Sequence, residues 1–129
     1  MDVYKRWGWS GDQIQSAFRK NPRCMTVSEE KIMAVMSFLV NEIGYDSSSP
    51  AECPLIFYCS LKDRIIPRCS VIKILVSKGL IKEMIPLCSI STIVDKAFLE
   101  RFVQMYGQEV PELMKVFQGH RNYQDLLQN

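Results

Sequence analysis

The stretch from Cys53 to Leu80, CPLIFYCSLKDRIIPRCSVIKILVSKGL, determines how we interpret the rest of this chain. It joins a proline-led apolar turn to a serine suited to begin a helix, and it ends near a glycine suited to stop one. A weaker version of the same order occurs upstream, from Asn21 through Ser28 to Gly44. Units of roughly 30 residues are typical of helical repeats. The sequence therefore predicts a helical-repeat fold.

Capping residues and apolar spacing place the first helices. A capping-box pattern beginning at Ser10 predicts a helix that reaches about Lys20. Its apolar side is formed by Ile14, Ala17 and Phe18. The range 28–44 follows, with a serine at its start, a glycine at its end and apolar residues at helical spacing between them. This is the clearest helix in the sequence.

The range 60–79 predicts a further helix, from Ser60 to the glycine stop at Gly79. Apolar residues lie on more than one side of it, which is typical of an inner helix that neighbours cover on several sides. Pro67 lies inside the pattern and predicts a start or a kink near Ile65.

The predicted helices after Leu80 are shorter. Thr92-x-x-Asp95 indicates the start of a helix that ends near Gly107, and residues 109–118 predict a last helix before a glycine stop. Residues 120–129 are polar, so we expect them to fray. No window alternates polar and apolar residues as a strand would, so the predicted fold class is all-α.

The chain of 129 residues, 47% of them hydrophobic, is long enough for one compact domain. We predict a single helical-repeat domain over residues 1–129, with repeats at about 11–44 and 46–80 in a short, right-angled, α-solenoid-like stack. Capping helices over about 81–119 and the polar tail at 120–129 complete it. The longest strongly apolar run, Ile32 to Val40, is much shorter than the roughly 20 residues that span a bilayer, so no membrane association is expected.

The charge is unevenly distributed along the chain. The formal net charge is only +2, from 16 basic and 14 acidic residues. Between Lys62 and Lys82, however, there are six basic residues and one acidic residue, Asp63. An anionic partner should therefore meet the first two thirds of the chain.

The composition argues against an enzyme or a metal protein. Five cysteines without a C-x-x-C pair, and one histidine, do not fit a zinc site or a disulfide framework, so we interpret the cysteines as buried thiols. Catalysis by a nucleophile and a general base could use only Cys59 or Cys88 together with His120. His120, however, lies in the predicted tail. We expect no catalytic residue, metal site, cofactor or small-molecule substrate.

The segment PLIFYCSLKDRIIPR, residues 54–68, resembles the mitochondrial transcription termination factor (mTERF) family, in its plant branch. The segment FRKNPRCM at 18–25, and residues 91–103 followed by Pro111, Glu112 and Leu113, resemble flanking blocks of the same C-terminal region of that family. The resemblance covers about Trp9 to Gly119. The combination is specific, although each piece alone is common.

The resemblance implies a superhelix of helical repeats whose basic concave groove binds double-stranded nucleic acid in mitochondria or chloroplasts. It implies a role in organellar transcription, its termination or RNA maturation, and we favour DNA over RNA as the ligand. Family members usually carry more repeats and an organelle leader. This sequence shows about two and a half repeats and no visible leader, so a fragment, a truncated copy and a partner-dependent module all stay open.

The candidate nucleic-acid-binding residues come from two sources. Matching the family pattern position by position nominates Arg19, Lys20, Arg23, Arg64 and Arg68. The local charge excess adds Lys62, Lys73, Lys78 and Lys82.

Three alternatives accompany these candidates. The basic residues can instead be a solvated helix face, or structural ion pairs and caps near Asp63. The chain can instead be a protein-binding helical module that uses its seven methionines as an adaptable surface. Five aromatic residues could stack on bases, but we expect packing roles for them: Trp7, Trp9, Tyr45, Phe57 and Tyr58.

Overall fold

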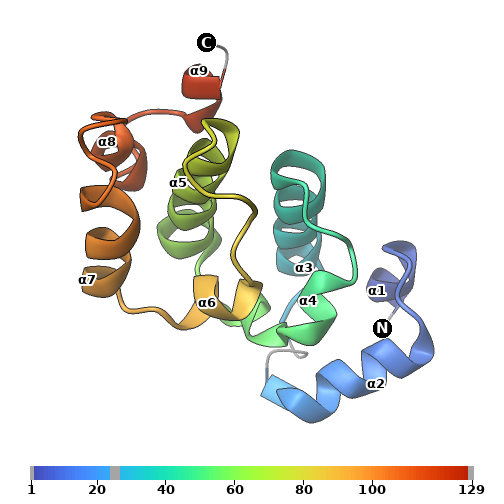
Figure 1. The fold of residues 1–129 in the computed structure, drawn as a ribbon. Helices are drawn as coiled ribbons and strands as arrows, with labels where there is room; N and C mark the ends of the chain where they lie inside the picture. The colour runs from blue at the N-terminus through green and yellow to red at the C-terminus, as the bar shows by residue number, and fades with distance from the viewer. Residues whose placement is uncertain (1, 24–26, 128–129) are drawn as a thin grey trace. The chain divides into compact units, whose positions relative to one another are not determined.

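The computed structural model describes residues 2–23 and 27–127, and within these ranges it contains helices and no strand (Figure 1). The all-α prediction is confirmed. The chain forms two compact units, unit 1 over Met1–Leu61 and unit 2 over Lys62–Asn129. The predicted repeat 46–80 is divided between them. The single domain and its right-angled stacking stay predictions.

Unit 1 is built from short helical segments joined by tight turns. In chain order they are α1 Asp2–Arg6, α2 Gly11–Lys20, α3 Glu29–Met36, the π-helical η2 Ser37–Ile43, α4 Ser49–Glu52 and the 3-10 helix η3 Pro54–Tyr58.

Local capping explains where α2 begins and ends. The Ser10 hydroxyl accepts a hydrogen bond from the Gln13 amide at 3.1 Å, and the Ser10 amide donates to Gln13 Oε1 at 2.8 Å. This reciprocal pair is the predicted capping box. The helix ends at Lys20, because Pro22 disfavours helical geometry in the preceding residue, Asn21, whose amide still donates to the Ala17 carbonyl as a cap.

The predicted helix 28–44 is also confirmed, as α3 and its continuation η2. The Ser28 hydroxyl accepts from the Lys31 amide at 3.3 Å, which caps the start. At the other end Gly44 adopts a φ of 101°, a left-handed conformation that disfavours side chains with a Cβ.

An aromatic cluster contributes to the core of unit 1. The rings of Tyr4 and Trp9 stack at 4.7 Å, and Phe57 meets Tyr4 edge to face at 5.8 Å. All three side chains are buried, and Trp9 Nε1 donates to the Ser47 carbonyl. The predicted packing roles of Trp9 and Phe57 are confirmed, whereas Tyr58 is 62% exposed and the same prediction is wrong for it.

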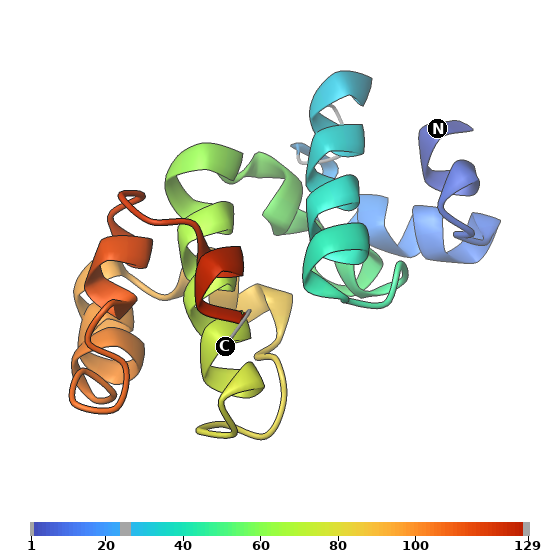
Figure 2. The ribbon, with the colours of Figure 1, turned by 90° about the horizontal axis from the view of Figure 1, so that it is seen from above.

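Unit 2 surrounds one buried helix. Its elements are α5 Ile66–Ser77, α6 Leu87–Thr92, α7 Asp95–Phe98, the π-helical η5 Leu99–Gln104, α8 Leu113–Phe117 and α9 Tyr123–Leu127. The π-helical η4, Leu61–Ile65, leads into α5. Helices α8 and α9 and the segment η5 all contact α5, and both ribbon views show α9 beside it (Figure 2). The prediction that this helix is covered on several sides is confirmed.

The proline in this helix has the predicted effect. Pro67 lies in the first turn of α5, directly after the π-helical segment that ends at Ile65. Because proline has no amide hydrogen, it fits the start of a regular α-helix better than its interior. The helix ends before Gly79, which adopts a φ of 76°.

Two predictions for unit 2 are wrong. Thr92 does not begin a helix: it is the last residue of α6, where its hydroxyl donates to the Cys88 carbonyl at 2.7 Å. The next helix, α7, begins three residues later, after an extended turn. The tail does not simply fray either, because Tyr123 and Leu126 are buried in α9.

The interpretation of all five cysteines as buried thiols is also wrong. Cys69 is a buried free thiol and Cys59 is a half-buried one. Cys53 is half-buried and Cys88 exposed, and both are disulfide-bonded. Cys24 lies outside the described residues. Burial raises the pKa of the Cys69 thiol well above its ordinary value.

Two further features of the described ranges concern membranes and metal ions. None of the helices there is both long and apolar enough to span a bilayer. The same residues contain no group of three or more His, Cys, Asp and Glu side chains arranged to hold a metal ion.

Candidate nucleic-acid interface

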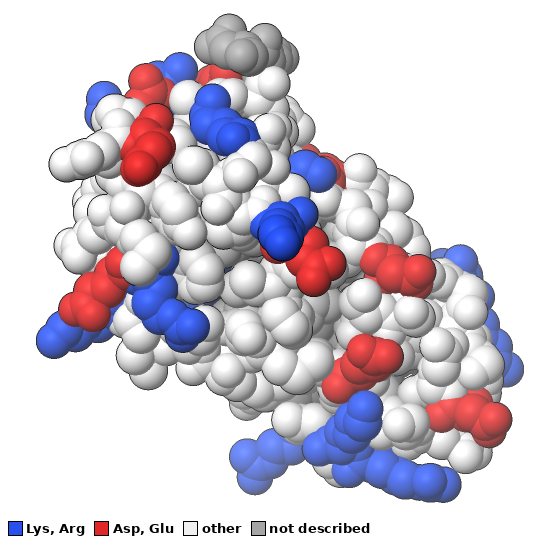
Figure 3. All heavy atoms as spheres, in the orientation of Figure 1, with Lys and Arg blue, Asp and Glu red and all other residues white. Residues whose placement is uncertain are grey.

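The end of α2 and the turn after it carry the first group of candidate residues, which we call the α2 basic cluster: Arg19, Lys20 and Arg23. All three side chains are exposed. Figure 3 shows Lys and Arg atoms gathered along the lower edge of the view, in the region where Figure 1 places α2. Arg19 and Lys20 lie in the last turn, where cations also interact favourably with the helix dipole. The cluster is therefore compatible with helix stabilisation and with anion binding.

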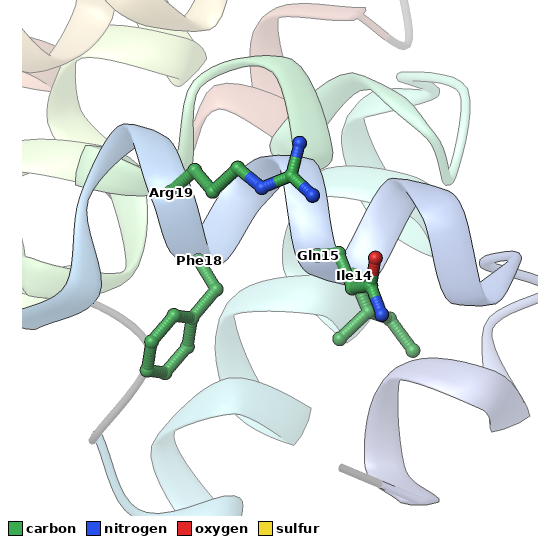
Figure 4. Close-up of a pocket in the computed structure, with 4 residues that line it drawn as sticks. All are labelled: Ile14, Gln15, Phe18 and Arg19. Carbon is green, nitrogen blue, oxygen red and sulfur yellow. The ribbon is translucent and has the colours of Figure 1, made fainter.

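A shallow hollow lies directly beside this cluster. It has a volume of about 360 Å³, and among the described residues the side chains that line it are Ile14, Gln15, Phe18 and Arg19 of α2. Figure 4 shows the Phe18 ring projecting from one side of the helix, while the Arg19 side chain runs along the helix toward Gln15. The ring is 43% exposed. The sequence predicts that Phe18 lies on the apolar side of α2 with Ile14 and Ala17. In the structure only Ile14 and Ala17 are buried.

The second group belongs to unit 2 and has mixed exposure. Lys62, Lys78 and Lys82 are exposed, and Lys73 is half-buried on α5. Unit 2 holds ten of the 16 basic residues and seven of the 14 acidic ones, whereas unit 1 holds six basic and seven acidic residues. The excess of positive charge therefore belongs to unit 2.

Arg68 lies inside unit 2. Its side chain is 1% exposed, and its guanidinium lies over the Phe98 ring at 5.2 Å. Nη1 donates to the carbonyls of Ile90 and Ile93, and Nη2 donates to Asp95 Oδ1 at 2.7 Å. A phosphate has no access to this guanidinium in the structure. Arg68 is therefore not part of the interface proposed below.

Arg64, in the turn before Arg68, contacts the same segment around residues 90–93. It is half-buried, and its Nη1 donates to the Ser91 carbonyl at 2.9 Å. Together the two arginines bind backbone oxygens between residues 90 and 93, at the junction of α6 and α7. The alternative of a structural ion pair is confirmed for Arg68, which pairs with Asp95.

The fold and the exposed cations together define a class, the all-helical repeat proteins with basic surface clusters. A model of the mTERF family matches residues 1–99, which contain every candidate residue named above. The chain therefore belongs to the mTERF family, as its motifs indicated. Membership suggests nucleic-acid binding and regulation of transcription or its termination, by repeat proteins that are generally not enzymes. A search of curated proteins and a search of solved structures each gave no match.

Proposed function

We propose that this protein binds double-stranded nucleic acid, DNA rather than RNA, and regulates transcription or its termination in mitochondria or chloroplasts. The observation that supports this most directly is the match to the family over residues 1–99. Six exposed candidates lie within the matched range: Arg19, Lys20, Arg23, Lys62, Lys78 and Lys82.

The proposed contacts are to phosphates. Lysine and arginine side chains that neutralise phosphates release condensed counterions, so the logarithm of the affinity falls with the logarithm of the salt concentration by about 0.9 for each phosphate on duplex DNA. Such contacts fix the position of a protein on the duplex without reading its sequence. The proposal therefore predicts strongly salt-dependent binding with little sequence preference from these residues.

Three charge-matched variants test the proposal. The first changes the α2 basic cluster, Arg19, Lys20 and Arg23, to glutamine, and the second changes Lys62, Lys78 and Lys82. A control changes three exposed bases outside the candidate set: Lys96, Arg101 and Lys115. Each triple variant removes the same charge, so any difference between them reports position rather than net charge.

Fluorescence anisotropy with a labelled duplex at about 50 and about 200 mM salt gives the affinities and the salt slopes. We expect each of the first two variants to bind more weakly, with a slope reduced by about 2 to 3, which corresponds to about 0.9 for each lost contact. The control should keep the slope of the unmodified protein. Equal weakening in all three variants would show that net charge alone matters.

A helical module that binds proteins remains the competing function. Three large apolar side chains, Tyr58, Val94 and Met105, are exposed and would be available to a protein partner. It predicts no duplex binding by a well-folded sample even at the lower salt concentration. That result would overturn the proposal for this chain.

A further inference from the structure

Thr92 lies where a helix ends and the chain becomes extended. It is the last residue of α6, it is exposed, and its hydroxyl donates to the Cys88 carbonyl at 2.7 Å. The next two residues, Ile93 and Val94, have extended backbone angles, with ψ values of 129° and 154°. Figure 1 shows this stretch as the link between α6 and α7, without a helical turn. The surface therefore presents a hydroxyl followed by extended backbone.

The third residue after Thr92 is an accessible carboxylate. Asp95 forms an ion pair with the buried Arg68, yet the Asp95 side chain is 80% exposed. Acidophilic serine/threonine kinases recognise a hydroxyl followed at this spacing by a carboxylate, which pairs with basic side chains of the kinase. They bind the acceptor segment in an extended conformation. Residues 92–95 supply both the spacing and the conformation.

The structure distinguishes Thr92 from other residues with the same spacing. A hydroxyl side chain is also followed by a carboxylate three positions later at Thr26, Ser49 and Ser60. Thr26 lies outside the described residues. Ser49 begins α4 and is followed by proline, and Ser60 directly precedes the π-helical η4. Among the described residues with this spacing, Thr92 is therefore the one that extended backbone follows.

We propose that Thr92 is a phosphorylation site for an acidophilic serine/threonine kinase. In the transfer, Thr92 Oγ1 forms a bond to the γ-phosphorus of ATP while the bond from that phosphorus to the ADP oxygen breaks. The hydroxyl proton passes to the general base of the kinase, and ADP leaves. The product carries a charge of about −1.5 to −2 at neutral pH. This modification does not depend on the proposed nucleic-acid binding.

The phosphate acts on the contact that Arg64 makes with the neighbouring residue. Arg64 Nη1 donates to the Ser91 carbonyl at 2.9 Å, and Thr92 follows Ser91 directly. Because a dianion attracts a guanidinium more strongly than a neutral carbonyl does, the phosphate competes for Arg64. It also adds negative charge at the C-terminal end of α6, where the helix dipole disfavours anions. Phosphorylation therefore loosens the junction of α6 and α7.

A kinase assay on the full chain tests the site. The protein is incubated with ATP and a purified casein kinase of the acidophilic class, and tandem mass spectrometry locates the phosphate. We expect Thr92 to be the main acceptor. Asp95→Asn should lower the rate at Thr92 by at least about tenfold, because it removes a charge-assisted contact with the kinase. Ser60→Ala, at another residue with the same spacing, should leave that rate unchanged.

Thermal unfolding of the phosphorylated protein tests the effect on the fold. We expect the melting temperature to fall by about 4 °C or more, the shift that one lost charged hydrogen bond gives in a chain of this size. In Arg64→Met, which has no guanidinium to withdraw, phosphorylation should cause no more than about half of that fall. Arg101→Met removes an exposed arginine of the same unit and should show the full fall.

A synthetic peptide of residues 86–99 gives the assay its reference. If the peptide is phosphorylated and Thr92 of the folded protein is not, the site is refuted, because the segment is then inaccessible in the fold. If neither is phosphorylated, recognition through the Asp95 carboxylate is refuted. Phosphate at Thr92 with equal shifts in Arg64→Met and Arg101→Met, or with no shift, would establish the site and overturn the role given to Arg64.

Discussion

At the scale of single residues, Arg68 shows how a basic side chain can serve the fold instead of a ligand. It lies in a family motif and has the charge that phosphate binding requires. In the structure its guanidinium contacts two backbone carbonyls, a carboxylate and an aromatic ring, all between residues 90 and 98. Removing it would leave the buried Ile90 carbonyl and the part-buried Ile93 carbonyl without this donor, and an unpaired buried group costs about 1 to 3 kcal/mol.

We therefore expect Arg68→Met, which keeps the apolar stem, to lower the free energy of unfolding by about 2 to 4 kcal/mol. Asp95→Ala should lower it by less than about 1 kcal/mol, because the Asp95 side chain is 80% exposed and solvent screens its charge. Urea unfolding followed by circular dichroism measures both. A stable Arg68→Met variant with weakened duplex binding would show instead that Arg68 contacts nucleic acid.

The two free cysteines of the described ranges should differ in reactivity. Burial raises the pKa of the Cys69 thiol, so at neutral pH its reactive thiolate is rarer than that of an ordinary cysteine. Cys59 is half-buried. Brief alkylation with iodoacetamide followed by mass spectrometry should label Cys59 in the folded protein and Cys69 only after unfolding in urea. Equal labelling rates in the folded protein would contradict this.

At the scale of elements, the ends of the helices are set by local chemistry. Gly79 has a φ of 76°, and a Cβ built there meets no atom within 4 Å. A Cβ at Gly11, in the first turn of α2, also meets none, but its φ is not positive. The two glycines therefore differ in backbone conformation and not in available space.

Gly79→Ala should accordingly destabilise the protein by about 1 to 2 kcal/mol through the left-handed conformation alone. Gly11→Ala should be neutral or slightly stabilising, because alanine favours a helix by about 1 kcal/mol over glycine. Thermal and urea unfolding of the two variants provide the comparison. Similar losses in both would exclude backbone conformation as the cause.

The short helix α9 should matter more than its length suggests. It packs against α5, and its side chains Tyr123 and Leu126 are both buried. The double variant Tyr123→Ala/Leu126→Ala should lose about 2 to 4 kcal/mol of stability and bind more of a dye that reports exposed apolar surface. Gln124→Ala, on an exposed residue of the same helix, is the control and should change little. An unchanged double variant would show that α9 adds nothing to the core.

How much the sequence predicts depends on whether the signal is local. The helices at 10–20, 28–44 and 60–79 were predicted because serine caps, glycine stops and apolar spacing act within one helix. The tail helix was missed, because two apolar residues in a five-residue helix carry no clear period and their burial depends on α5. The burial of Arg68 was equally hidden, since its acceptors lie 22 to 27 residues away in the chain. The exposure of Phe18 depends in the same way on what neighbouring segments cover.

At the scale of the whole molecule, the two basic groups belong to different units. If both contact the same duplex, their contributions to the binding free energy should add within about 0.5 kcal/mol, as those of distant, independent sites usually do. A variant combining both triple substitutions should then lose the sum of the two single effects in an anisotropy titration. A combined variant no weaker than one of its parents would mean that only one unit contacts the duplex.

The buried network of Arg68 also bears on how inherited or engineered changes at this motif should be interpreted. A substitution there would show the same loss of activity in a cell as one in a phosphate contact, but for another reason. Chaperones and proteases continuously remove unfolded chains, and a loss of 1 to 2 kcal/mol can change protein abundance several-fold. The phenotype would therefore follow the amount of protein present, and immunoblotting before any binding assay would reveal it.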